Sequence, residues 1–150
     1  LLRNAAKLET TGPVGLGSVR LEGASSWEYK SDAEQGLAVT LTGGSSFTAA
    51  KTHSIVANGG LVAEGGSTFQ ISDMTGTRVR LSEGSKMINQ DAVAGSDVRI
   101  LSQISFVDGI GTEWQVAGTF RPRGATGVYI RNGGTISNCV IANDCVIRDS

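Results

Sequence analysis

Gly44-Ser45-Ser46-Phe47 and Gly66-Ser67-Thr68-Phe69 are two copies of one motif, a turn of Gly with Ser or Thr that leads into a large apolar residue. Three further copies are Gly23-Ala24-Ser25-Ser26-Trp27, Gly84-Ser85-Lys86-Met87 and Gly111-Thr112-Glu113-Trp114. The first three glycines are 21 and 22 residues apart, and the fourth follows after 18 residues. A unit of about 20 residues can bury its apolar face only by stacking on its neighbours. The motif therefore predicts an elongated solenoid.

Between these turns, apolar and polar residues alternate over short stretches. Such alternation places the apolar side chains inward and the residue between them outward, as in a strand with one buried face. Two examples are Ile104-Ser105-Phe106, with Phe106 predicted inward, and Val128-Tyr129-Ile130, with Tyr129 predicted outward. In each unit an aromatic-led strand is followed by an aliphatic strand. The aliphatic strands are predicted to begin at Val19, Val39, Leu61, Val79 and Val98.

The predicted fold is an all-β, single-stranded parallel β-helix with coils of about 20 residues and no long helices. Hairpin meanders and sandwiches are the alternatives, but they usually have longer strands and hairpin turns such as Asn-Gly. In a β-helix each strand lies above the equivalent strand of the previous coil, so like residues stack on like. The large residues of the motif then form an inward-facing core ladder, Trp27, Phe47, Phe69, Met87 and Trp114, for which a sugar-stacking row is the alternative. The glycines are the predicted coil corners, Gly23, Gly44, Gly66, Gly84 and Gly111.

The composition argues against several other classes of protein. The chain has 150 residues, of which 39% are hydrophobic and 18% charged, and this is too apolar for a disordered chain. With 5% aromatic residues and 21 glycines, it suits thin aliphatic layers separated by turns. The net charge of -1 without basic clusters predicts no nucleic-acid partner. No apolar run approaches the roughly 20 residues of a membrane-spanning helix.

The sequence is divided into a leading segment or linker over residues 1–18 and a β-helical repeat domain over residues 19–150. Residues 5–9 form the best helical window, but it is short. The chain begins at Leu1 without a signal-peptide pattern, and neither end carries an evident capping repeat. We therefore expect a fragment of a longer protein. The open strand edges of such a fragment predict further coils, a cap or a homotrimer.

The C-terminal tail has a shorter rhythm, N-C-V-I-A-N-D-C-V-I over residues 138–147. This six-residue repeat is consistent with one flat face of a coil per hexapeptide. Cys139 and Cys145 are either linked by a small-loop disulfide or buried as free thiols, and the high burial of free cysteine favours the thiols. The tail resembles the hexapeptide repeats of left-handed β-helix acyltransferases and sugar nucleotidyltransferases. That resemblance implies a catalytic His, for which the chain offers only His53; an exposed turn residue is the favoured interpretation.

The stretch F-V-D-G-I-G-T-E-W-Q-V-A-G-T-F over residues 106–120 carries a second resemblance. Together with the G-A-T-G-V-Y-I-R-N-G-G-T-I stretch over residues 124–136, it is similar to the passenger coils of bacterial autotransporter adhesins and to the right-handed β-helices of phage tailspikes and tail fibres. The resemblance covers residues 20–136. It implies an extracellular location, at a cell surface or on a virion, and a surface for adhesion.

Candidate catalytic groups are few. Glycoside cleavage needs two carboxylates about 5 to 10 Å apart. Glu64 and Glu83 each precede a glycine of the turn motif and lie 19 residues apart, so stacking could bring them together; a solvated surface pair is the favoured alternative. One His and two Cys do not form a zinc set, and turn residues such as Asp91 and Asp97 form no calcium-loop pattern, so we predict no metal and no cofactor.

These observations favour a non-enzymatic structural or adhesive segment over an enzyme. The expected partners are a cell-surface glycan or receptor, bound on exposed turns, and the neighbouring coils of the parent chain. A polysaccharide-cleaving tailspike and a hexapeptide-repeat acyltransferase are the alternatives.

Overall fold

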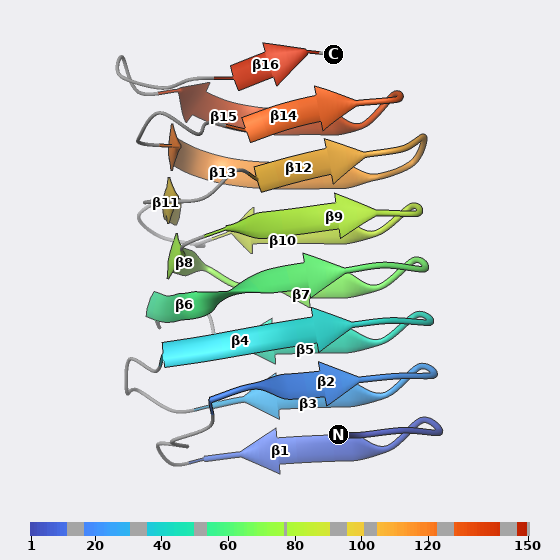
Figure 1. Ribbon diagram of the computed structural model, residues 1–150. Coiled ribbons are helices and arrows are strands. Elements are labelled where there is room, and N and C mark those ends of the chain that lie inside the picture. Colours follow the sequence, from blue (N-terminus) through green and yellow to red (C-terminus); the bar gives the residue numbers. More distant parts are fainter. Residues whose placement is uncertain are drawn as a thin grey trace.

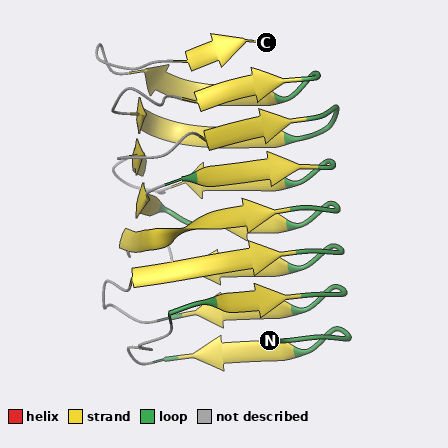
Figure 2. Ribbon diagram, in the orientation of Figure 1, coloured by secondary structure: helices red, strands yellow, loops and turns green. Residues whose placement is uncertain are grey.

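The computed structural model describes residues 1–11, 17–30, 36–49, 54–76, 78–90, 96–100, 105–122, 128–141 and 147–149. Within these residues all regular secondary structure is β-strand, and every paired set of strands is parallel (Figures 1 and 2). Successive coils stack from the N-terminal to the C-terminal end, with tight turns along one edge. The predicted all-β parallel solenoid is confirmed.

Face A of the solenoid consists of the strands that follow the tight turns. They are β1 (Lys7–Thr10), β3 (Ser26–Tyr29), β5 (Ser46–Ala49), β7 (Thr68–Gln70), β10 (Lys86–Gln90) and the first parts of β13 (Glu113–Pro122) and β15 (Thr135–Ile141).

Face B consists of the strands that precede the turns. They are β2 (Val19–Leu21), the later parts of β4 (Gly36–Leu41) and β6 (Ser54–Ala63), then β9 (Val79–Ser82), β12 (Ser105–Asp108), β14 (Val128–Arg131) and β16 (Ile147–Asp149).

A shorter face C begins with Gly36 of β4, which pairs with Val56 in the first part of β6. It continues through β8 (Asp73–Gly76), β11 (Ser96–Ile100) and the last parts of β13 and β15. The residues of the C-terminal hexad lie partly here, since Cys139 aligns with Gly118 and Ile141 with Phe120. Ile147, six residues after Ile141, lies on face B in β16.

The aliphatic strand predicted at Val98 lies on face C, so its assignment to the face-B series is wrong. Val98 pairs with Met74 of β8 and Phe120 of β13, whereas the strand next to β9 on face B is β12. The coil from Met87 to Trp114 therefore spans 27 residues, against 18 from Phe69 to Met87. It is a longer coil, because β11 and the residues beside it precede β12.

The predicted orientation of Phe106 is also wrong. Ser105 and Val107 are fully buried, and Phe106 between them is half-buried on the outer surface of face B. A serine can occupy the interior here because its hydroxyl accepts a hydrogen bond from the Val79 amide at 2.8 Å. The polar inward residue reversed the alternation that the sequence suggested.

Residues 1–11 are part of the solenoid, in contrast to the leading segment or linker expected over residues 1–18. Strand β1 pairs with β3, and Leu2 forms a parallel bridge with Leu21. Leu2 and Leu8 pack against the buried core. Of the short window that suggested a helix, residues 7–9 belong to strand β1 and pair in register with β3, whereas Ala5 lies in a turn with a φ of 59°.

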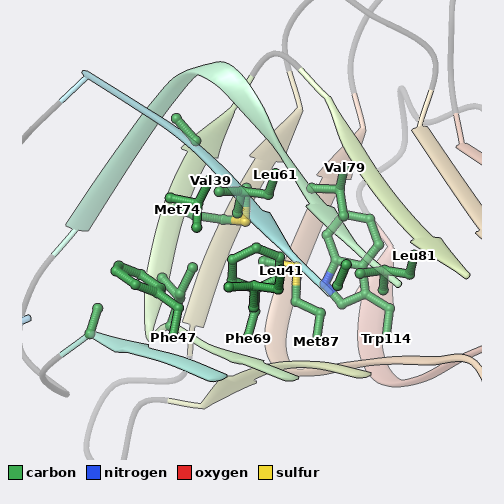
Figure 3. Close-up of a cluster of buried hydrophobic side chains, with 14 of the residues drawn as sticks. Val39, Leu41, Phe47, Leu61, Phe69, Met74, Val79, Leu81, Met87 and Trp114 are labelled. Atoms are coloured by element: carbon green, nitrogen blue, oxygen red, sulfur yellow. The ribbon is translucent and has the colours of Figure 1, made fainter. Parts of the chain in front are cut away.

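The core is a thin apolar layer between the faces (Figure 3). The large residues of the turn motif align in one column on face A and are at most 1% exposed; they are Trp27, Phe47, Phe69, Met87 and Trp114. The Trp27 and Phe47 ring centroids lie 4.9 Å apart, and those of Phe47 and Phe69 lie 6.1 Å apart, both edge to face. Such ring contacts add about 0.5–1.5 kcal/mol each beyond the burial of their surface.

Most of the tight turns place two consecutive residues in the left-handed region of φ, whereas the turn before Thr112 has positive φ at Gly109 and Gly111. Gly43 and Gly44 have φ values of 64° and 75°, and Gly65 and Gly66 have 60° and 71°. The five predicted corner glycines have positive φ, but Gly23 aligns with Gly43 and not with Gly44. The 21-residue glycine spacing therefore differs from the 20-residue step from Trp27 to Phe47.

Each of these turns is followed by a fully buried hydroxyl. The column consists of Ser25, Ser45, Ser67, Ser85 and Thr112, and we call it the hydroxyl ladder. The Ser67 hydroxyl donates to the Glu64 carbonyl at 2.7 Å and accepts a hydrogen bond from the Ser45 amide at 3.2 Å. The ladder thus joins consecutive coils through groups that would otherwise be buried without partners.

Candidate functional site

Glu64 and Glu83 lie on the turn edge of the solenoid, and both are exposed. They are not stacked on each other, because Leu81 aligns with Ala63 and this places Glu83 beside Gly65. The Gly66 amide donates to the Glu83 carbonyl at 3.0 Å, in agreement with this register. The two carboxylates therefore occupy different positions of the repeat, offset by one residue.

A different group of side chains gathers on the outer surface of face B. One outward row runs across its strands, and its residues are Arg20, Thr40, Val62, Arg80, Phe106 and Tyr129, with Arg148 at the next register position. The row changes in character at β12 and β14, where two half-buried aromatic residues replace the polar and aliphatic residues of earlier coils.

Arg80, Phe106, Tyr129 and Arg131 form a stacked group, which we call the arginine–aromatic cluster. The Phe106 and Tyr129 ring centroids lie 5.7 Å apart with an interplanar angle of 32°. The Arg131 guanidinium lies 4.3 Å from the Phe106 centroid and 5.2 Å from that of Tyr129. The Arg80 guanidinium lies 5.6 Å from the Phe106 centroid. Both distances to Phe106 are within the range of a cation–π interaction.

Neither arginine of the cluster forms an ion pair with a described residue. Asp108 aligns with Arg131 in the register of β12 and β14, but its Oδ1 accepts a hydrogen bond from Asn132 Nδ2 at 2.8 Å. The guanidinium groups thus lie against aromatic rings, and among the described residues no ion pair occupies their N–H donors.

Charged side chains at the N-terminal end of the solenoid are paired instead. Glu22 bridges Arg20 at 2.6 Å and Arg3 at 2.9 Å. Lys30 lies 3.1 Å from Glu9 and 3.5 Å from Glu28. The pKa of Lys30 is raised above its usual value, chiefly by the hydrogen bond to Glu9 and further by the charge of Glu28.

The arrangement of the cluster suits recognition of a ligand. Aromatic rings offer a flat apolar surface against which the C–H groups on one face of a sugar ring can pack. A guanidinium provides a rigid fork of donors that fits a carboxylate in a bidentate manner. No cluster of His, Cys, Asp and Glu able to hold a metal and no enclosed pocket occurs among the described residues. No helix in the same part of the chain is long and apolar enough to span a membrane.

Several residues singled out in the sequence lie in parts of the chain that the structure does not describe. His53 and Cys145 lie outside the described residues, and only the backbone of Cys139 is described. The cluster itself was missed by sequence reasoning. Tyr129 was predicted outward, but Phe106 was assigned to the core, so the two rings were not recognised as neighbours one coil apart. Their 23-residue separation, close to the coil length, was the signal that could have paired them.

The chain matches no protein-family model, no curated protein and no solved structure. The fold therefore defines the class, a repeat protein of parallel β-solenoid architecture.

Proposed function

We propose that the chain is a non-enzymatic β-helical segment of an extracellular surface adhesin or a phage host-attachment protein of the tailspike or tail-fibre type. In this proposal the solenoid is a stiff spacer, and its outer surface binds a glycan or receptor on a cell. The observation that carries the proposal is the arginine–aromatic cluster on face B.

The cluster supports binding because aromatic and arginine side chains dominate the energetics of recognition surfaces. Phe106 and Tyr129 occupy outward positions, where burying them contributes nothing to the apolar core between the faces. The turn that follows β12 carries Ile110, which is 89% exposed. Arg131 and Asp108 are the last residues of their strands, so the cluster adjoins the turn edge.

The spacer role is supported by continuity between coils. Backbone hydrogen bonds connect neighbouring turns, as in the pairs Ala24 to Gly43 and Gly44 to Gly65, both 2.8 Å. The hydroxyl ladder and the core column run in the same direction. A surface attached to such a scaffold keeps its geometry, which favours a binding role for exposed side chains.

The test is binding of the purified chain to an array of bacterial and animal cell-surface glycans, followed by titration of the best ligand. Phe106→Ala and Tyr129→Ala should each weaken binding about tenfold, as expected for a central aromatic contact. Thr40→Ala, on the same outward row in β4, is the matched control and should leave the affinity unchanged. The proposal would be contradicted if Phe106→Ala and Tyr129→Ala bound the glycan as tightly as Thr40→Ala does. It would also be contradicted if the chain bound no glycan and no cell.

A further inference from the structure

The arginine–aromatic cluster brings two arginines to one ring, and neither forms an ion pair with a carboxylate among the described residues. Arg80 and Arg131 both approach the Phe106 ring, at 5.6 Å and 4.3 Å, so two like charges share one ring. Neither has a carboxylate partner among the described residues, whereas Arg20 on the same outward row is paired with Glu22 at 2.6 Å. A bound anion would give the guanidinium groups an ionic partner that no described residue supplies.

From this arrangement we propose that the cluster binds a carboxylated polysaccharide. A carboxylate is held by the guanidinium fork of Arg131, with Arg80 as a second cation, and the adjoining sugar ring packs against Phe106 and Tyr129. This inference rests on the proposed function, that face B binds a glycan, and it adds the chemical class of the ligand.

The placement of the cluster fits a polymer better than a small anion. Arg80, Phe106 and Tyr129 lie on three neighbouring strands, β9, β12 and β14, at aligned positions. Adjacent strands are about 4.8 Å apart, so a chain lying along the solenoid axis meets these residues in turn. The two aromatic rings pack against its sugars and orient the polymer along the axis, and the two arginines bind its carboxylates.

The charge of the whole chain favours a sparsely charged polymer over a nucleic acid. The net charge is -1, and carboxylates such as Glu22 and Glu64 lie on the same turn edge as the cluster. Duplex DNA carries one phosphate charge per about 1.7 Å of its axis and would approach these acids unfavourably. A polysaccharide with one carboxylate per sugar or per several sugars can match two arginines and meets less of that repulsion, because its charges are further apart.

The experiment is calorimetric titration with polygalacturonate, alginate, hyaluronan and polysialate, with methyl-esterified polygalacturonate and dextran as neutral probes. At least one carboxylated polymer should bind, and neutral polymers should bind at least about tenfold more weakly, the loss expected for one charge-assisted contact. Raising NaCl from about 50 mM to about 500 mM should weaken binding of the carboxylated polymer, because salt screens the attraction between charges.

Variants separate the cluster from general electrostatics. Arg131→Gln and Arg80→Gln should each reduce affinity for the carboxylated polymer about tenfold, and Arg131→Lys should lose less because it keeps the charge without the fork. Arg20→Gln removes the same charge from the same row and should have no effect. Thermal unfolding of each variant establishes that the fold is retained.

Three outcomes would overturn the inference. One is equal binding of the esterified and free polymers, which would leave the proposed glycan-binding function standing. The second is unchanged affinity of Arg80→Gln and Arg131→Gln. The third is failure of every carboxylated polymer to bind; if no glycan of the array binds either, the proposed function is contradicted as well.

Discussion

The Ser67 hydroxyl shows at the scale of one residue why the motif contains serine. It is fully buried, donates to the Glu64 carbonyl at 2.7 Å and accepts from the Ser45 amide at 3.2 Å. We expect Ser67→Ala to lower the free energy of unfolding by about 1–3 kcal/mol, because it leaves the buried Ser45 amide without this acceptor. Urea denaturation measures the change. Ser46→Ala, on the partly exposed neighbouring position, is the control and should cost less than about 0.5 kcal/mol.

Gly65 and Gly66 allow the backbone strain of a turn to be separated from close packing. A Cβ atom at Gly65 would lie 3.1 Å from the Gly43 backbone nitrogen, whereas a Cβ atom at Gly66 would have no neighbouring atom within 4 Å among the described residues. Gly66→Ala should cost about 1–2 kcal/mol for the left-handed conformation alone. Gly65→Ala should cost more, since the neighbouring turn must also move. Ala24, with a φ of 58° at the position equivalent to Gly66, shows that the smaller cost is tolerated. Equal unfolding midpoints of the two variants would refute the packing argument.

The role of single residues was only partly predictable from the sequence. The motif revealed the spacing of the coils, because glycine in a left-handed turn and a large residue after it are both visible in the sequence. The hydroxyl ladder was not recognised, since a serine beside a glycine is equally common in a solvated turn. Glu83, with a φ of 54°, occupies a position that is glycine in the two preceding coils. Because the residue type changes there, the alignment of Glu83 with Gly65 could not be predicted from the sequence.

At the scale of the strands, the buried side chain of Asn89 holds three coils together. Its Nδ2 donates to the Ile71 carbonyl at 2.8 Å, and its Oδ1 accepts from Trp114 Nε1 at 2.7 Å. We expect Asn89→Leu to destabilise the protein by about 2–4 kcal/mol, because it leaves a buried carbonyl and a buried indole N–H without these partners. Chemical denaturation of the purified variant gives the number.

A second substitution tests whether the cost comes from the unpaired indole. In the background of Asn89→Leu, the further change Trp114→Phe removes the orphaned N–H, so the double variant should lose less stability than the sum of the single variants. A coupling energy of about 1 kcal/mol or more supports the hydrogen bond, whereas strict additivity would contradict it.

The order of strands was less predictable than their existence. Val98-Arg99-Ile100 alternates in the same way as a face-B strand, and Val98 and Ile100 are both buried, yet it forms β11 on face C. Alternation shows that a strand has one buried side but not which face of the coil it joins. In β12, the predicted inward positions are shifted by one residue from the observed ones. The cause is Ser105, which is buried and hydrogen-bonded to the Val79 amide but resembles an outward residue in the sequence.

At the scale of the whole molecule, the solenoid is held together by contacts between neighbouring coils. Phe69 packs on Phe47 at 6.1 Å and aligns with Met87, while β14 lies several coils further along the axis. In such an arrangement stability is a sum of coil and nearest-neighbour terms, so damage spreads over a short range. A defect at Phe69 should therefore loosen the strands around it more than the distant ones.

Amide hydrogen exchange of Phe69→Ala tests this locality. The change removes a fully buried ring and should cost about 3–5 kcal/mol. Protection in β5, β7 and β10 should fall by about a hundredfold or more, since every 1.4 kcal/mol is a factor of ten, whereas β14 should lose far less. Phe69→Leu, which refills most of the volume, should give the same pattern with a smaller fall. An equal loss of protection in β7 and β14 would instead mean that the coils unfold as one cooperative unit, and that Tyr129 and Arg131 of the arginine–aromatic cluster, both on β14, depend on packing several coils away.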